Sequence, residues 1–280
     1  MHPAISVIFF TVTSGAGYGM LALLALSRLF GLDLQLQPQQ IAVIGGIGLL
    51  LITAGLISST FHLANPKNAW RAFSRFRTSW LSREGVLAVA FYPVVLAYLF
   101  AEWKFAAEAG PGVTVLAILT LALALLTVFA TGMIYACLKT IRQWNTALTP
   151  TNYIVLGLML GALFLAALVA LMTGLPIHTA LGFTRATVRL LDVGHTAGTF
   201  LTDEFGYQVE RFRLLVLRAL VIALAFVIPA LLLFGLLGEV QTAHLVIAAI
   251  LAYAGVFIER WLFFAEARHV VNLFHGAQTT

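Results

Sequence analysis

Long apolar runs alternate with short polar stretches along most of the chain. Each run is about as long as the roughly 20 residues that an α-helix needs to cross a bilayer. The runs are too long and continuous for barrel strands, and an open backbone would go unsatisfied in lipid. The sequence therefore predicts an all-α transmembrane helical bundle, a single integral membrane domain over residues 1–280. Seven helices are clear: Ile5–Phe30, Ile41–Leu63, Gly85–Trp103, Gly112–Leu138, Thr151–Thr173, Leu214–Leu237 and Ala243–Phe264.

The segment Pro176–Phe200 is a possible eighth helix. Arg185, Arg189 and Asp192 interrupt it, and each is costly at mid-membrane. The Lys and Arg residues near the other helix ends place the amino terminus and the basic connections on the cytoplasmic side. The same rule places the basic start of the helix Leu214–Leu237 on the cytoplasmic side. The fifth helix should end on the outer side, so an eighth crossing is required between the two. The sequence leaves open whether this segment crosses or forms an outer loop.

The stretch His62–Glu84 is the only long polar interruption in the first half of the chain. Asn65 and Pro66 form a helix-start signal. The basic residues Lys67, Arg71 and Arg75 recur every four positions, and the aromatic residues Trp70, Phe73 and Phe76 recur every three. In an α-helix these two sets lie on separate faces, which predicts a short amphipathic helix at the membrane surface.

Two compatible interpretations follow for this stretch. It is a membrane-surface anchor that obeys the positive-inside rule, or its basic face is also a dock for a soluble subunit. In the second interpretation Lys67, Trp70, Arg71 and Arg75 are the docking residues.

An ionisable residue stands at each end of the same stretch. His62 ends the second apolar run, and its ordinary pKa of about 6.5 suits proton exchange near neutral pH. Glu84 opens the third helix, with Ser82 as a possible cap. Each has a simpler structural interpretation, because helix dipoles favour a histidine at a C-terminus and a carboxylate at an N-terminus. Together they are also a suitable pair for the proton transfers of a quinol at the edge of a wet pocket.

Composition narrows the function classes. The chain is 61% hydrophobic and 10% charged, against about 25% charged residues in soluble domains. The net charge of +5 is uneven, so it indicates orientation in the membrane and no nucleic-acid binding. Cys137 is the only cysteine, whereas a thiolate-bound iron–sulfur cluster normally needs four. No nucleophile–base arrangement or metal cage suggests that the chain performs substrate chemistry alone.

Two further features bear on packing and on the site. Gly15 and Gly19 in the first helix, and Gly157 and Gly161 in the fifth, have the spacing that lets helices approach closely. Glu259 and Arg260, near the end of the last helix, either line the same pocket or form an interfacial helix end with snorkelling side chains.

Three stretches resemble a known family: SVIFFTVTSGAGYG, STFHLANPKNAWRAFSRFRTSWLSREGV and ERWLFFAEARHVVNLF. They are similar to the membrane-anchor subunit of dimethyl-sulfoxide-reductase-type molybdoenzyme complexes, including the related anchor of membrane-bound sulfite dehydrogenases. The resemblance covers most of the chain, and the middle stretch is its most specific part. Anchors of that family have eight helices, one more than the clear number here.

The resemblance implies a complex of three subunits in the bacterial inner membrane. A molybdenum-cofactor catalytic subunit and a four-cluster iron–sulfur subunit sit on a haem-free anchor that exchanges electrons with menaquinone or ubiquinone. It also implies that His62 and Glu84 bind the quinone. We expect Arg77, Trp80 and Arg83 to shape that pocket, and we expect the basic stretch on the cytoplasmic side.

Other function classes stay open at this point. A transporter or channel predicts paired charges or broken helices mid-membrane, and a b-haem cytochrome anchor predicts two histidines facing each other inside the bundle. A purely structural anchor predicts no quinone contact at all.

Overall fold

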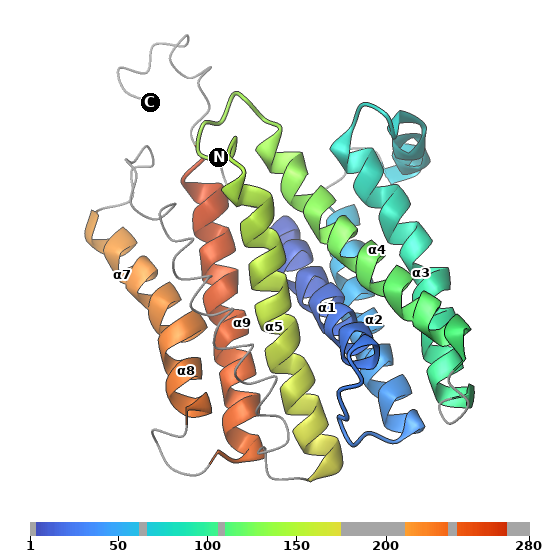
Figure 1. Cartoon of the computed structure of the whole chain (residues 1–280). Coiled ribbons are helices and arrows are strands. Elements are labelled where there is room, and N and C mark those ends of the chain that lie inside the picture. Colours follow the sequence, from blue (N-terminus) through green and yellow to red (C-terminus); the bar gives the residue numbers. More distant parts are fainter. Residues whose placement is uncertain (1–3, 62–65, 106–109, 175–210, 235–239, 268–280) are drawn as a thin grey trace, which may run out of the picture.

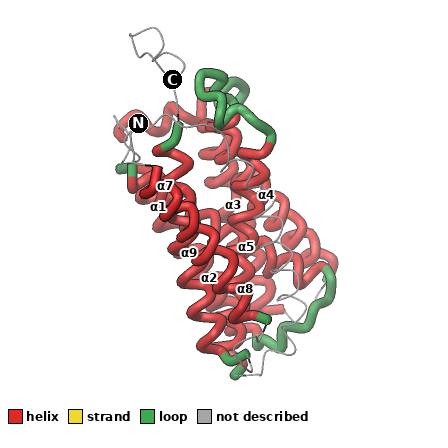
Figure 2. The backbone as a smooth tube through the Cα atoms, turned by 90° about the vertical axis from the view of Figure 1, so that its left-hand side faces the viewer, coloured by secondary structure: helices red, strands yellow, loops and turns green. Residues whose placement is uncertain are grey.

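The protein was analysed as a computed structural model, which describes residues 4–61, 66–105, 110–174, 211–234 and 240–267. Its helices lie side by side in one elongated bundle (Figures 1 and 2). Seven of the described helical segments are long and apolar enough to span a membrane, which confirms the predicted fold class. The elements are α1 (Ile5–Leu29), α2 (Pro38–Thr60), η1 (Pro66–Arg75), α3 (Trp80–Phe105), α4 (Pro111–Ala136), α5 (Leu148–Thr173), α7 (Arg211–Val221), η5 (Ile222–Val227), α8 (Ile228–Leu233) and α9 (Thr242–Ala265).

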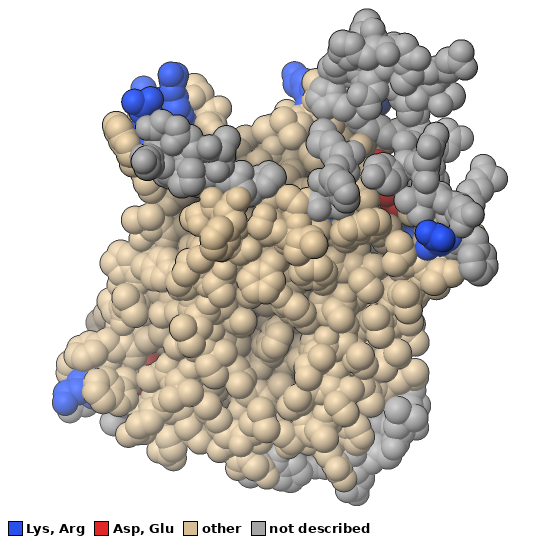
Figure 3. Space-filling model, turned by 180° about the vertical axis from the view of Figure 1, so that it is seen from behind, with Lys and Arg blue, Asp and Glu red and all other residues tan. Residues whose placement is uncertain are grey.

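The chain alternates between the two ends of the bundle. Figure 1 shows η1, the connection from α4 to α5, the start of α7 and the end of α9 at one end, which we call the basic end. Lys and Arg atoms gather mainly there in Figure 3, in agreement with the predicted grouping of the connections. The end of α5 and the start of α7 lie at opposite ends of the bundle. The possible eighth helix, Pro176–Phe200, lies outside the described residues.

Helix α1 is the centre of the bundle, because it packs against α2, α4, α5 and α9. Its contacts with α5 are backbone to backbone at the predicted glycines. A Cβ atom added at Gly19 would overlap the backbone of Gly157, and one added at Gly161 would overlap the backbone of Gly19. A Cβ atom at Gly17 would lie 2.6 Å from the carbonyl oxygen of Gly48 in α2. These small residues therefore fix how closely α2 and α5 approach α1.

The segment between η1 and α3 differs from the expectation. Helix α3 begins at Trp80, before the predicted Gly85, so Glu84 lies in its second turn. The capping side chain is Ser79, whose Oγ accepts the backbone N–H of Ser82 at 3.4 Å; the prediction of Ser82 as the cap was wrong. The cause is that η1 ends at Arg75 and the following turn ends before Ser79, so Ser79 directly precedes the first residue of α3.

The element η1 is a 3₁₀-helix and not the α-helix that the amphipathic pattern predicted. A 3₁₀-helix has three residues per turn, so side chains four apart are rotated by about 120°. Arg71 and Arg75 are therefore rotated apart around η1, and the prediction that these two share one face was wrong. Residues three apart are eclipsed, which keeps Trp70 and Phe73 aligned.

The last two spans meet at another close contact. Between α7 and α8 the chain forms the π-helical segment η5, in which the helix is locally wider than an α-helix. A Cβ atom at Gly255 of α9 would lie 2.5 Å from the backbone nitrogen of Ala225 in η5. The glycine thus seats η5 against α9, which carries part of the site.

We predict that Gly161→Val destabilises the bundle by about 2 kcal/mol or more, because overpacked interiors force backbones apart. The valine Cβ would overlap the backbone of Gly19. The matched control is Gly46→Val, since a Cβ atom at Gly46 has no neighbour within 4 Å among the described residues. Thermal unfolding in detergent measures both variants. Equal midpoints for the two would contradict the account of α1–α5 packing.

Candidate functional site

Glu84 is a buried carboxyl group on α3, only 5% exposed. Thr131 of α4 lies 2.5 Å from it, between Thr131 Oγ1 and Glu84 Oε1. The same hydroxyl lies 3.1 Å from the carbonyl oxygen of Thr127. A hydroxyl has one proton and can donate to only one acceptor at a time. An ionised Glu84 can accept a hydrogen bond from the Thr131 hydroxyl, and a protonated Glu84 can donate one to it. The carboxyl group therefore keeps this hydrogen bond in both protonation states, as a proton-exchanging group requires.

Three tyrosines on other helices lie within electrostatic range of Glu84: Tyr18 of α1, Tyr135 of α4 and Tyr153 of α5. The Tyr18 ring packs edge-on against Phe91, with ring centroids 5.0 Å apart. Its hydroxyl is buried and makes no hydrogen bond to any residue that the structure describes. A buried hydroxyl without a partner is uncommon, and it marks a place where a polar ligand atom or a water fits.

Arg260 of α9 closes the cluster from the far end of the chain. Its guanidinium carbon lies 3.8 Å from the centroid of the Tyr153 ring, and Tyr153 stacks on Tyr135 at 5.7 Å with an interplanar angle of 20°. Arg260 is 2% exposed and Glu259 is part-buried, with 3.4 Å between Arg260 Nε and Glu259 Oε2. Asn152 donates to the other Glu259 oxygen at 3.2 Å. Of the two interpretations of this pair, snorkelling is wrong: the bundle encloses Arg260.

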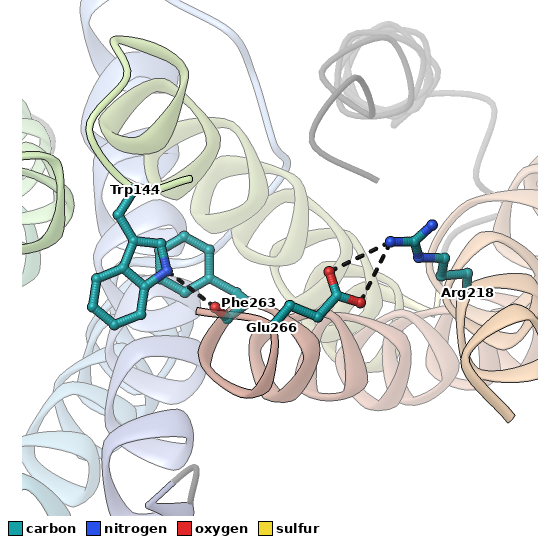
Figure 4. Close-up of polar contacts among 4 residues, drawn as sticks. All are labelled: Trp144, Arg218, Phe263 and Glu266. Carbon is teal, nitrogen blue, oxygen red and sulfur yellow. Dashed lines mark hydrogen bonds and ion pairs between the residues drawn. The ribbon is translucent and has the colours of Figure 1, made fainter. Parts of the chain in front are cut away.

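A second set of contacts fixes α9 in place beside the cluster (Figure 4). Trp144, in the connection from α4 to α5, donates its indole N–H to the carbonyl oxygen of Phe263 at 3.0 Å and stacks on that ring at 5.2 Å. At the end of α9, Glu266 pairs with Arg218 of α7 at 3.4 Å. Burial raises the pKa of Glu266, and the Arg218 guanidinium partly offsets this. These contacts hold α9 between its neighbours and so position Arg260.

The predicted pocket residues at the start of α3 are tied to the backbone. Arg83 donates to the carbonyl oxygens of Phe76 at 3.0 Å and of Arg77 at 2.8 Å. Its guanidinium also lies 4.2 Å from the centroid of the Trp80 ring. Arg83 therefore closes the connection between η1 and α3.

The other predicted pocket residues are placed differently. The Trp80 ring packs edge-on against Phe129 of α4, with ring centroids 5.9 Å apart, so Trp80 faces α4 as Glu84 does. The side chain of Arg77 is exposed. His62 lies outside the described residues.

The predicted docking residues lie on the surface of the basic end. Trp70 is 65% exposed, and Arg71 and Arg75 are exposed beside it. The Arg71 guanidinium lies 5.7 Å from the centroid of the Trp70 ring. The side chain of Lys67 lies outside the described part of the chain. The surface thus combines an exposed aromatic ring with cations, which is a common composition at protein interfaces.

A separate polar cluster lies at the other end of α3. Arg28 Nε is 3.3 Å from Glu102 Oε1, beside an open cavity of about 300 Å³ that Tyr98 and Asp33 also line. Glu102 follows Glu84 by 18 residues, which is about 27 Å along a helix. This cavity is therefore distinct from the cluster around Glu84.

Sequence reasoning missed the residues that surround Glu84. Tyr18, Thr131, Tyr135 and Tyr153 each lie inside an apolar run, where a single hydroxyl-bearing residue is common. One signal was available: Thr131 and Tyr135 are four apart and so share a helix face.

Comparison with known proteins identifies the family. The family model described as DMSO reductase anchor subunit (DmsC) matches residues 1–266. A relative from Allochromatium vinosum, named as a subunit of sulfite dehydrogenase, is 35% identical over 322 residues, which covers 98% of this chain and 99% of the relative. The predicted resemblance is confirmed. The chain belongs to the family of DMSO reductase anchor subunits, multi-pass membrane proteins that anchor the catalytic and electron-transfer subunits of an oxidoreductase complex.

Proposed function

We propose that this chain binds quinone beside Glu84 and exchanges electrons with an iron–sulfur subunit docked over η1 and the turn that follows it. The complex also contains a molybdopterin catalytic subunit, and the iron–sulfur subunit carries four clusters. The observation that carries the proposal is a buried carboxyl group hydrogen-bonded to Thr131 next to the unpartnered hydroxyl of Tyr18, in the part of the chain that is described.

The residues present fit a quinone head group. Tyr18 offers a buried donor that lacks an acceptor within the described segments, and a carbonyl oxygen is such an acceptor. Glu84 can hold or release a proton, and Thr131 can hydrogen-bond to either form of its carboxyl group. The aromatic side chains around them suit a flat ring, as in most small-molecule sites. A quinone supplies two-electron, two-proton chemistry when bound.

The roles of the chain's own residues follow from this geometry. Glu84 exchanges a proton with the ligand oxygen, and the hydrogen bond to Thr131 Oγ1 holds the carboxyl group in place. Trp80 and Arg83 close the pocket at the start of α3, because Arg83 is fastened to the carbonyls of Phe76 and Arg77. We propose His62 as a second proton-exchanging group and exposed Arg77 as an outer contact, on the family resemblance of their positions.

The name of the relative favours one type of complex. Because that relative belongs to a sulfite dehydrogenase, we propose a sulfite-oxidising partner in preference to a dimethyl sulfoxide reductase. The basic end then faces the cytoplasm across the bacterial inner membrane, since connections rich in Lys and Arg stay on that side. When the complex oxidises sulfite, electrons pass from the iron–sulfur subunit to quinone.

We predict that Glu84→Gln lowers quinone-coupled turnover at least about tenfold, because an amide of the same shape cannot exchange the proton. The assay is sulfite oxidation with decylubiquinone as acceptor, in membranes that contain the whole complex. Glu102→Gln is the matched control, a buried glutamate at the other end of α3. Turnover with a soluble artificial acceptor, which bypasses quinone, should stay unchanged. Undiminished quinone reduction by Glu84→Gln would support a purely structural anchor.

We predict that Arg71→Glu with Arg75→Glu lowers recovery of the iron–sulfur subunit several-fold when the anchor is purified from membranes. Both side chains are exposed at the basic end, so charge reversal should disturb docking and not folding. Lys104→Glu, an exposed cation at the end of α3, is the control. Mass spectrometry of the eluate counts the partners. Full recovery with the double variant would place the dock elsewhere, and an eluate without redox subunits would favour the transporter alternative.

A further inference from the structure

We propose that Arg260 of α9 donates a hydrogen bond to the second oxygen of the quinone bound beside Glu84. The inference rests on the proposed quinone site and adds a specific ligand-binding residue from the other end of the chain.

The first reason is the cost of burying Arg260. A guanidinium stays charged at any physiological pH, and its five N–H donors all need acceptors when water is excluded. Arg260 is 2% exposed in the middle of aromatic rings. It pairs with Glu259, which lies on the Nε side at 3.4 Å. The ion pair on the Nε side leaves Nη1, with its two N–H donors, still in need of an acceptor.

The second reason is an orphaned donor. Among the residues that the structure describes, Arg260 Nη1 is buried and has no hydrogen-bond acceptor. Buried polar atoms in folded proteins nearly always have a partner, so an acceptor is expected at this position. The guanidinium carbon of Arg260 lies 3.8 Å from the centroid of the Tyr153 ring. This cation–π contact stabilises the charge in part, but it gives the N–H groups no hydrogen-bond acceptor.

The third reason is the position of Arg260 relative to Glu84. Glu84 contacts Thr131, and Tyr135 follows Thr131 by one helical turn. Tyr135 stacks on Tyr153, and Tyr153 stacks on Arg260. Glu84 and Arg260 are therefore linked through neighbouring residues of α4 and α5, and both lie within electrostatic range of the same two tyrosines.

Charge decides the kind of acceptor. Glu259 already balances the charge of Arg260, and Asn152 in turn supports Glu259. The remaining donor therefore suits a neutral oxygen better than a second anion. Besides Tyr153 Oη and Glu259 Oε2, two of the buried polar atoms that lack hydrogen-bond partners within the described residues are the donors Tyr18 Oη and Arg260 Nη1. A quinone head group brings two neutral carbonyl oxygens, one for each.

The test compares variants that separate ligand binding from the stability of the ion pair. Arg260→Lys keeps the charge opposite Glu259 but loses the fork of donors. The double variant Glu259→Gln with Arg260→Gln removes both charges, so no buried charge is left unpaired. Arg218→Lys is the matched control, because Arg218 also pairs with a glutamate, Glu266, outside the cluster.

Two readouts are independent of substrate turnover. The first is the quinone extracted from the purified complex and measured by chromatography. The second is the dissociation constant for decylubiquinone from quenching of intrinsic tryptophan fluorescence. We expect both Arg260 variants to retain little quinone and to bind decylubiquinone at least about tenfold more weakly, by analogy with other lost charge-assisted contacts. Arg218→Lys should match the unmodified chain in both.

The outcomes distinguish this inference from the function on which it rests. Unchanged binding in the Arg260 variants, together with loss of binding in Glu84→Gln, means that Arg260 is a structural ion pair only and that the quinone site stands. Unchanged binding in all variants overturns both proposals. If Arg260→Lys fails to assemble, the double variant decides, since both of its replacement side chains are neutral.

Discussion

The burial of ionisable side chains in a bundle built for lipid is the constraint on which this structure depends. Charged groups within a membrane are costly and require local partners. Glu84 meets this requirement through Thr131, and Arg260 meets it in part through Glu259 and the Tyr153 ring. Each leaves a polar group beside it incompletely satisfied within the described chain. A site that binds a quinone, a neutral ring with two carbonyl oxygens, needs polar groups that are free to hydrogen-bond to those oxygens.

Close helix packing makes this arrangement possible. The Gly19–Gly161 contact lets α1 and α5 touch backbone to backbone, and α1 also packs against α4 and α9. The Trp144–Phe263 contact then holds α9 against the basic end. Glu84 lies in the second turn of α3, and α3 packs against η1, so the candidate site lies at the same end of the bundle as the exposed surface around Trp70.

The seven clear helices could be predicted from the sequence, because they follow from local patterns. The role of Glu84 stays a prediction that rests on the family resemblance. A run of 20 apolar residues has one stable form in lipid, and Gly15, Gly19, Gly157 and Gly161 have a spacing with one common use. The burial of Arg260 could not be predicted, since it depends on which helices stand next to α9. The 3₁₀ form of η1 was missed for a related reason: the α-helical period fits its basic residues, whereas the aromatic spacing of three fits the form that the structure has.

The most direct test of the central claim is an electron cryo-microscopy structure of the intact complex with decylubiquinone bound. The account predicts ring density with one oxygen within hydrogen-bonding distance of Glu84 or Tyr18, inside the cluster that Tyr135 and Tyr153 form. Density instead in the cavity beside Arg28 and Glu102, at the other end of α3, would contradict it. In that case Glu84 would be a buried structural carboxyl group with no redox role.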